Sequence, residues 1–405
     1  MRHLRSTLAV LLLTTLSLSP LLATCGGGGG GGMGGMASGG MSAGGGISRT
    51  YQVPWVVLGP GQKGAAKEGL IVYWLPPSVA AAKGSDMQTS RTLALLSGHC
   101  VNFAIVTPDN DAMRGQLAVT DKVDMAVLTT ADGKEIGRAM PDGAKALNPS
   151  QVEKLVNGEI KSREQGADRK LSQASEKEKS GDADGAVALY STVYGDRCLV
   201  PGSAKKAAKA LKKLGKPVDE KASELAPLPN LSPDVNARME RTLAAGLAAE
   251  NDGRYAQAKE LYRRANLLDP HDPIALRFLA ELERHHLGDW AAAKRDFAAV
   301  LAMKADPISR AVALHGLGKM TIHGGEFAQG LALFEQSIAT YPLPLTYRNL
   351  AVYWNSEGQV EKAQGFVKQA LALAPDDPYN QIFAAAFAVE DGRRDEALRI
   401  AQANE

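Results

Sequence analysis

Cysteine is scarce in this chain. Its 405 residues include three cysteines, Cys25, Cys100 and Cys198, and no two of them form a C-x-x-C pair. Dithiol redox sites and structural zinc sites need closely spaced thiols, so the sequence predicts neither. Cys100 stands beside His99, but neighbouring residues of a strand point to opposite faces, which makes His99 a poor base for the thiol. We expect Cys100 to be a buried structural thiol, with a disulfide to Cys198 as the alternative.

A strong net charge and the common catalytic motifs are also absent. Charged residues make up 22% of the chain and nearly cancel to a net charge of +2, which does not favour binding to nucleic acid. The sequence contains no G-x-S-x-G, no H-E-x-x-H, no phosphate-binding glycine loop that opens a helix after a strand, and no plausible pair of catalytic carboxylates. We therefore predict no catalytic residue, no metal, no cofactor and no small-molecule substrate.

An apolar run, Leu8–Leu22, follows a basic start. The run is short for a transmembrane helix and rich in Ser and Thr, so residues 1–25 are predicted to be an export signal. Its last residues, Leu22-Ala23-Thr24-Cys25, resemble a bacterial lipoprotein box. The resemblance implies that Cys25 carries a lipid and anchors the protein to a membrane. Thr24 departs from the small residue usual before that cysteine, and ordinary signal cleavage is the alternative.

Residues 26–48 are almost all Gly, Met, Ser and Ala. Such a segment buries too little apolar surface to offset the entropy of ordering it, so it is predicted to be a flexible tether. Together with the lipoprotein box, it suggests an exported, anchored protein that faces the periplasm or the cell exterior.

The second half of the chain contains an internal repeat. A Gly-x-x-x-x-small phrase returns at intervals of 35, 37, 33 and 34 residues, with its glycines at Gly253, Gly288, Gly325, Gly358 and Gly392. Intervals of this size are typical of stacked helix pairs rather than of propeller blades or horseshoe repeats. The sequence therefore predicts an all-α repeat array over residues 235–405.

This array resembles the tetratricopeptide repeat. Small residues stand where the two helices of a unit cross, with glycine in the first helix (Gly246, Gly318) and alanine in the second (Ala258, Ala293, Ala363). Pro270, Pro342 and Pro375 follow the second helix. The resemblance implies an α-α superhelix whose concave wall, formed by the first helix of each unit, binds a partner protein or peptide.

Groove positions of the family can be carried onto this sequence. The candidates for contact with a peptide are Phe278, His285, His286, His315, Lys319, His323, Arg348 and Asn355. Four of the seven histidines fall among them, which raises the alternative of a metal site or a pH switch. We favour ordinary polar wall residues, because no carboxylate or cysteine joins these histidines at ligand spacing in the sequence.

Residues 49–160 show a different pattern, with apolar runs of strand length, short helical segments and a hairpin around Asp132-Gly133. An α/β sandwich is predicted. The domain is similar to thioredoxin-like domains at Tyr73-Trp74, at residues 101–106 and over residues 127–138. The two redox cysteines of that family would fall near Ser78 and Ala81, so the resemblance implies the fold without its redox chemistry.

Residues 161–225 are predicted to be helical, with a divergent helix pair around Gly181. A lysine-rich helix follows from Ala204, and no acidic residue interrupts its lysines. We interpret these lysines as a solvated face, with contact to anionic lipid or an acidic partner as the alternative. Residues 226–234 form a proline-rich linker before the array.

Three functions remain. The one we favour is an exported, lipid-anchored, non-catalytic scaffold that binds partner peptides through the repeat groove. The second is a thiol oxidoreductase that works through Cys100 as an atypical single-cysteine site. The third is a structural envelope component without a dedicated ligand.

Overall fold

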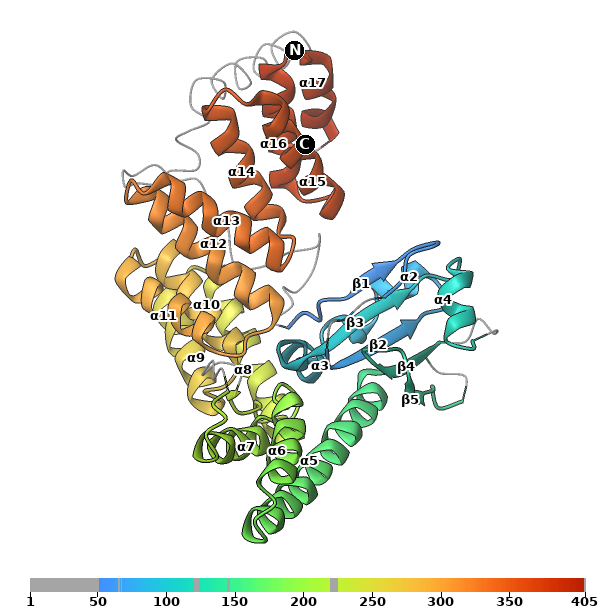
Figure 1. Ribbon diagram of the computed structural model, residues 1–405. Coiled ribbons are helices and arrows are strands. Elements are labelled where there is room, and N and C mark those ends of the chain that lie inside the picture. Colours follow the sequence, from blue (N-terminus) through green and yellow to red (C-terminus); the bar gives the residue numbers. More distant parts are fainter. Residues whose placement is uncertain are drawn as a thin grey trace.

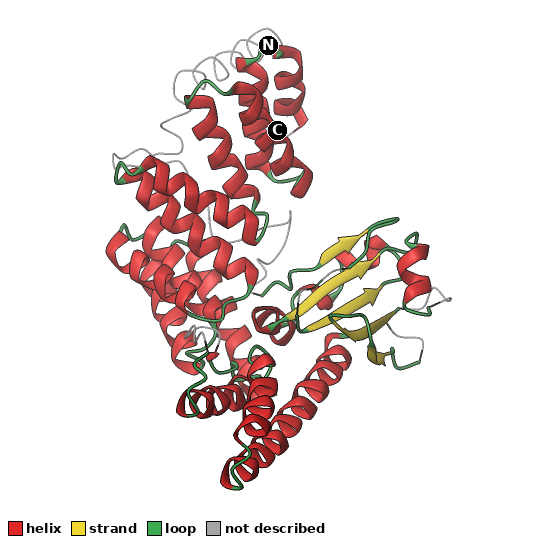
Figure 2. Cartoon of the chain, in the orientation of Figure 1, coloured by secondary structure: helices red, strands yellow, loops and turns green. Residues whose placement is uncertain are grey.

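The computed structural model describes residues 51–64, 66, 68–119, 124–143, 146–218 and 225–403. The predicted export signal, the lipidation site Cys25 and the glycine tether lie outside the described residues. Figure 1 shows three parts, coloured from blue to red along the chain. A small sheet comes first, three helices follow it, and a stack of helix pairs completes the chain (Figure 2). Among the described residues, no helix is both long and apolar enough to cross a bilayer.

The sheet has five strands in the order β1-β3-β2-β4-β5. Strands β1, β3 and β2 run parallel, and β4 and β5 complete the sheet as an antiparallel pair. Gly133 takes a positive φ in the turn between β4 and β5, so the Asp-Gly hairpin is confirmed. The strands are β1 Val56–Leu58, β2 Leu70–Leu75, β3 Val101–Val106, β4 Met125–Thr130 and β5 Glu135–Ala139.

The two faces of the sheet belong to different cores because side chains alternate along a strand. Ile71 and Tyr73 face a small core that also holds Met113. Val72 and Trp74 face the other way, into an apolar core that continues through the helices to the repeat array. The short helical segments of this unit are α2 Val79–Lys83, η1 Asp86–Gln88, α3 Arg91–Leu96, η2 Ser97–His99 and α4 Asp111–Gln116.

Three helices lie between the sheet and the array: α5 Pro149–Lys179, α6 Ala183–Gly195 and α7 Pro201–Lys213. The predicted boundary at residue 160 falls inside α5, which runs unbroken from the edge of the sheet into the helical region (Figure 1). A single long helix therefore belongs to both parts, and the boundary given by the change of pattern in the sequence is not a break in the structure.

The repeat array consists of antiparallel helix pairs, as the glycine period predicts. Each of the five periodic glycines follows the first helix of a pair and takes φ between 63° and 89°, a region that favours glycine. The pairs are α8 Pro233–Asn251 with α9 Tyr255–Leu268, α10 Pro273–His285 with α11 Trp290–Ala302, α12 Pro307–His323 with α13 Phe327–Thr340, α14 Pro344–Ser356 with α15 Val360–Leu373, and α16 Pro378–Glu390 with α17 Arg394–Ala403.

Close helix crossing explains the small residues of the repeat. A Cβ added at Gly246 would lie 2.5 Å from Cε1 of Tyr262, in the second helix of the same pair. We expect Gly246→Val to lower the free energy of unfolding by about 1–3 kcal/mol through overpacking. Gly365→Val is the matched control, since a Cβ there meets no atom within 4 Å. Equal midpoints in urea denaturation for the two variants would contradict this reading of the repeat.

A buried arginine links the sheet unit to the array, in addition to the shared apolar core. Arg91, at the start of α3, reaches the loop between α9 and α10, and its side chain is fully buried. Its Nη2 lies 2.6 Å from Oδ2 of Asp269, and its Nε lies 3.0 Å from Oδ2 of Asp272. The Tyr51 hydroxyl donates to the same Asp272 oxygen at 2.8 Å. Burial raises the pKa of Asp272, and the charge of Arg91 opposes that rise.

A disulfide forms a further link. Cys100 is bonded to Cys198, with 5.8 Å between their Cα atoms. The prediction of a free structural thiol at Cys100 is therefore wrong, and the alternative pairing is observed. Cys198 precedes α7 and Cys100 precedes β3, so the bond joins the sheet unit to the helical region.

Candidate peptide-binding surface

The first helix of each pair carries the predicted groove residues, but the helices differ in what they expose. In α10, every residue from Pro273 to Arg284 except Arg277 is buried. Phe278 is 2% exposed, and its ring stacks on Tyr262 with centroids 5.4 Å apart. Phe278 therefore supports the wall from inside and presents no surface to a ligand, contrary to the sequence prediction.

His315 in α12 and Arg348 in α14 are corrected in the same way. His315 is fully buried, its ring stacks on Phe334, and its Nδ1 lies 3.0 Å from the hydroxyl of Thr346. Arg348 is 9% exposed, and its Nη1 bonds to Asn380 of α16. Both side chains tie neighbouring pairs together, because the first helices pack against each other as well as against their own partners.

The remaining candidates lie nearer the surface. His285 and His323 are exposed, while His286, Lys319 and Asn355 are partly buried. The charge of Lys319 acts on both His285 and His323, so these three lie near one another, and Asn355 lies apart from them. His323 packs edge-on against Trp290, whereas Asn355 donates to Glu390 at 2.9 Å farther along the array.

The neighbouring histidines His285 and His286 each contact a buried carboxylate. His285 Nε2 lies 3.2 Å from Glu281, and His286 Nε2 lies 3.4 Å from Glu250. The sequence reading missed both pairs, although Glu281 and His285 are four residues apart on one helix. Glu250 comes from the preceding pair, so only the fold brings it to His286.

The charge states of Glu281 and His315 follow from their surroundings. Burial alone would raise the pKa of Glu281, but the charge of Arg284 and the hydrogen bond from His285 outweigh it and lower the pKa to about 2. Burial and the charges of Arg284 and Lys319 lower the pKa of His315 well below its usual value. Glu281 is therefore ionised at neutral pH and forms a buried ion pair with Arg284. His315 is neutral at the same pH.

One group of side chains in the described part of the chain has the composition of a metal site. Its three members, Glu68, Cys100 and Cys198, bring their ligand atoms close together. The two sulfurs are bonded to each other, so neither is a free thiolate. Burial and the charge of Lys304 lower the pKa of the neighbouring His99 to about 4, and its ring bonds to the backbone of Cys198.

A partly exposed apolar surface lies on α16, beside Arg348 of α14. The guanidinium of Arg348 lies 5.4 Å from the ring centre of Tyr379 and 5.9 Å from that of Phe383. Both rings are partly buried, and Ile382 beside them is 48% exposed. We call Tyr379, Ile382 and Phe383 the α16 surface. The sequence analysis missed these residues because it carried no groove position beyond Asn355, although the spacing of Tyr379 and Phe383 places both on one face of a helix.

No family model matches the chain, and no curated protein matches it. Three solved structures with similar coordinates are a thermophilic TPR protein of Thermus thermophilus, the type IV pilus biogenesis factor PilW, and pilF of Pseudomonas aeruginosa. Their identities to this chain are 25%, 19% and 14%, each with a TM-score of 0.33. They cover 40%, 59% and 59% of this chain, and 87%, 92% and 90% of their own. The Thermus structure is that of a TPR protein. This chain is largely helical, with a repeated helix pair and a small mixed sheet.

Proposed function

We propose that this protein is a non-catalytic scaffold that binds a peptide segment of a partner protein on the concave side of its repeat array. The observation that carries the proposal is the α16 surface. Tyr379 and Phe383 are partly exposed, whereas three other predicted wall residues, Phe278, His315 and Arg348, are buried. Aromatic side chains supply much of the binding energy at protein interfaces.

The chemistry of this surface selects the kind of peptide. Arg348 is already bonded to Asn380 and lies 3.4 Å from Asp377, so its charge is matched within the array. A ligand gains most here by placing an apolar or aromatic side chain against Ile382 and Phe383. An extended or helical segment with one such anchor, rather than an acidic motif, is the expected ligand.

The sheet unit is proposed to be thioredoxin-like without redox activity. Its strand order, with three parallel strands and a final antiparallel hairpin, supports this assignment. At the two positions where the family has cysteines, the Ser78 hydroxyl accepts from the backbone N–H of Ala81 at 3.0 Å and caps α2. These positions serve the local fold and offer no thiolate, which favours the scaffold over the oxidoreductase.

Export and anchoring through Cys25 belong to the same proposal. The disulfide between Cys100 and Cys198 supports an oxidising compartment, because such bonds persist mainly outside the cytosol. The periplasm or the cell exterior fits this requirement.

Peptide display on the full chain tests the proposal. We expect the native protein to enrich peptides with an apolar anchor and Phe383→Asp to weaken their binding about tenfold or more. Phe327→Asp is the matched control, since Phe327 is 55% exposed at the start of a second helix and lies off the concave wall. Failure to select any peptide, or equal losses in both variants, would refute the groove.

A further inference from the structure

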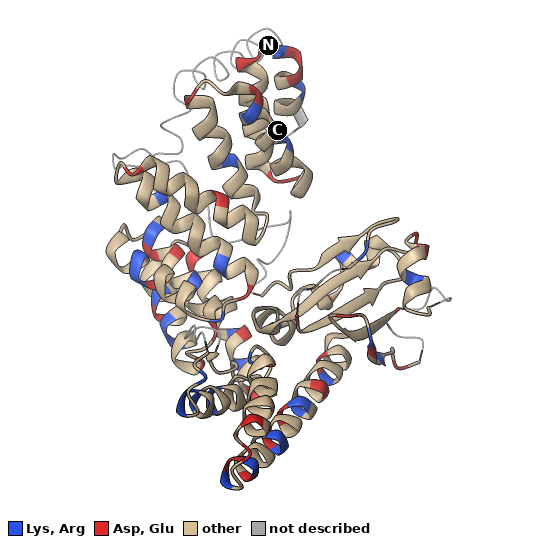
Figure 3. Ribbon diagram, in the orientation of Figure 1, with Lys and Arg blue, Asp and Glu red and all other residues tan. Residues whose placement is uncertain are grey.

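The face of α7 that points away from the protein is strongly basic. Between Arg197 and Val218 the sequence has no acidic residue, and six lysines lie in it: Lys205, Lys206, Lys209, Lys212, Lys213 and Lys216. All six are exposed. The opposite side of α7 is apolar and buried, through Ala204, Ala207, Ala208 and Leu211. Packing of this apolar side therefore leaves the lysines on the exposed side of the helix. Figure 3 shows α7 in blue along much of its ribbon.

This arrangement carries an electrostatic cost. Lys205 and Lys209 are four residues apart, and Lys209 and Lys212 are three apart, so like charges are neighbours on the helix surface and repel. The adjacent helix α5 alternates acidic and basic residues and avoids that repulsion. Solubility alone does not require a single sign on α7, since a mixed surface serves as well.

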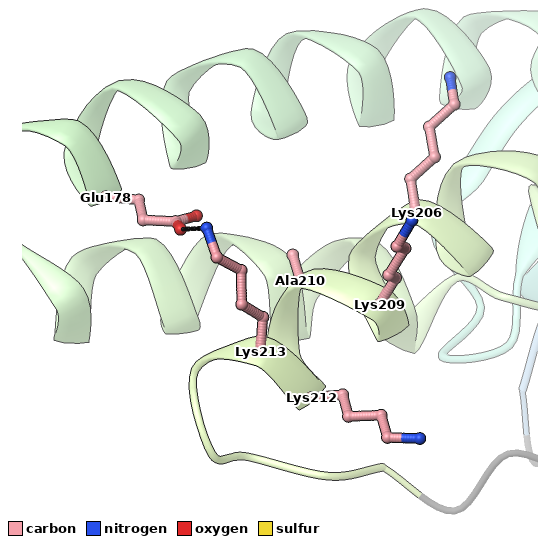
Figure 4. A pocket seen from close by; sticks show the side chains of 6 residues that line it. All are labelled: Glu178, Lys206, Lys209, Ala210, Lys212 and Lys213. Carbon is pink, nitrogen blue, oxygen red and sulfur yellow. Dashed lines mark hydrogen bonds and ion pairs between the residues drawn. The ribbon is translucent and has the colours of Figure 1, made fainter.

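Few of these charges are neutralised by the protein. Lys213 Nζ lies 2.7 Å from Glu178, and Lys206 Nζ lies 4.0 Å from Asp168, both on α5. Within the described residues, Lys205, Lys209, Lys212 and Lys216 make no ion pair. Figure 4 shows Lys213 meeting Glu178, while Lys212 points away from that pair. Four of the lysines, Lys206, Lys209, Lys212 and Lys213, border an open depression of about 500 Å³.

We propose that this lysine face docks on an anionic lipid bilayer and binds the phosphates of its headgroups. Lysine ammonium groups act as hydrated point charges and suit a diffuse anionic surface. Protein interfaces instead favour arginine and aromatic anchors and are poor in lysine. No large hydrophobic side chain of α7 is exposed, so the face lacks the apolar centre of a protein hot spot. An acidic protein is accordingly the less favoured occupant.

The proposal goes beyond peptide binding and does not depend on it. Docking through α7 would hold the protein against the membrane in one orientation, and the array would remain uncovered, because the lysine face lies outside the repeat pairs (Figure 1). It also does not require a lipid on Cys25, and the two can be tested separately.

Vesicle partitioning of the full chain with Cys25→Ala tests the docking without acylation. We expect binding to phosphatidylcholine vesicles that contain phosphatidylglycerol to exceed binding to phosphatidylcholine alone, and to fall with added salt. Replacing Lys205, Lys209 and Lys212 together with glutamine should weaken the anionic binding roughly 100-fold, since each lysine near the surface contributes about a five-fold factor. The matched control replaces Lys154, Lys161 and Lys179 of α5, which are also exposed, and should change binding less than about three-fold.

Lysine acetylation read by mass spectrometry locates the contact. On anionic vesicles we expect Lys205, Lys209 and Lys212 of the native chain to be labelled several-fold more slowly than on phosphatidylcholine alone, with the α5 lysines unchanged. Equal labelling on the two vesicles, or equal partitioning of the two triple variants, would overturn the proposal. An acidic protein would then become the candidate for this face.

Discussion

Replacing Arg91 with leucine is expected to lower the free energy of unfolding by about 3–5 kcal/mol, the usual cost of breaking a buried ion pair by removing one partner. Arg91 is 1% exposed and neutralises two carboxylates, Asp269 and Asp272, which are themselves 2% and 0% exposed. Leucine fills part of the volume but leaves both negative charges without a cation. The arginine Nη1 also donates to the carbonyl of Asn230 at 2.8 Å, and that contact is lost as well.

The loss should depend on pH in a definite direction. Burial already raises the pKa of Asp272, and removing the charge of Arg91 raises it further. In the variant, the pKa of Asp272 in the folded state then lies above its pKa in the unfolded state. The buried carboxylate therefore destabilises the fold at pH values above the unfolded-state pKa, and this destabilisation decreases as pH falls through the folded-state pKa. The deficit of the variant relative to the native chain should therefore shrink on acidification.

Urea denaturation of three proteins checks this prediction. Arg91→Leu combined with Asp269→Asn and Asp272→Asn should recover part of the loss, because amides need no cation. Arg264→Leu, at an exposed position of α9, should stay within about 0.5 kcal/mol of the native chain. If Arg91→Leu behaved like Arg264→Leu, the sheet unit would not be held to the array through this cluster.

Removal of the disulfide is expected to cost about 2–5 kcal/mol, as for other native disulfides. Cys100 and Cys198 are 98 residues apart, so the bond closes a long loop in the unfolded chain and reduces its entropy. It also joins the sheet unit to the segment before α7. The variant Cys100→Ser with Cys198→Ser should therefore unfold at lower urea and show earlier proteolysis of the sheet unit.

A reductant provides the control for the disulfide. It should lower the urea midpoint of the native chain to that of the double serine variant and leave the variant itself unchanged. Thiol titration of the unfolded, unreduced native chain should detect no reaction at Cys100 or Cys198. A free thiol at either position, together with a midpoint that ignores the reductant, would contradict the pairing.

The local conformations were within reach of sequence reasoning. The glycine period predicted the helix pairs. A residue that ends a helix in the left-handed conformation is usually glycine, and this chain has such a glycine after the first helix of every pair. Gly246 and Ala258 could be placed at crossings for a similar reason, since close contact between two helices leaves no room for a larger side chain. The Asp-Gly hairpin between β4 and β5 followed from its turn chemistry alone.

The candidate site was harder to predict from the sequence. Helical spacing put Phe278 and His315 on the wall, but it could not tell that neighbouring helices would cover them. The same spacing extended to Tyr379 and Phe383 would have found the α16 surface. The carboxylate partner of His286 could not be found in this way, because Glu250 belongs to another helix pair.

By itself, the sequence determined the repeat of helix pairs, the hairpin and the lack of a dithiol motif, since each depends on residues within a few positions of one another. Only the tertiary structure decided which wall residues are exposed, that Arg91 meets Asp269 and Asp272 across about 180 residues, and that Cys100 pairs with Cys198. Burial and pairing depend on segments far apart in the chain, and those segments meet only when the sheet packs against the helices.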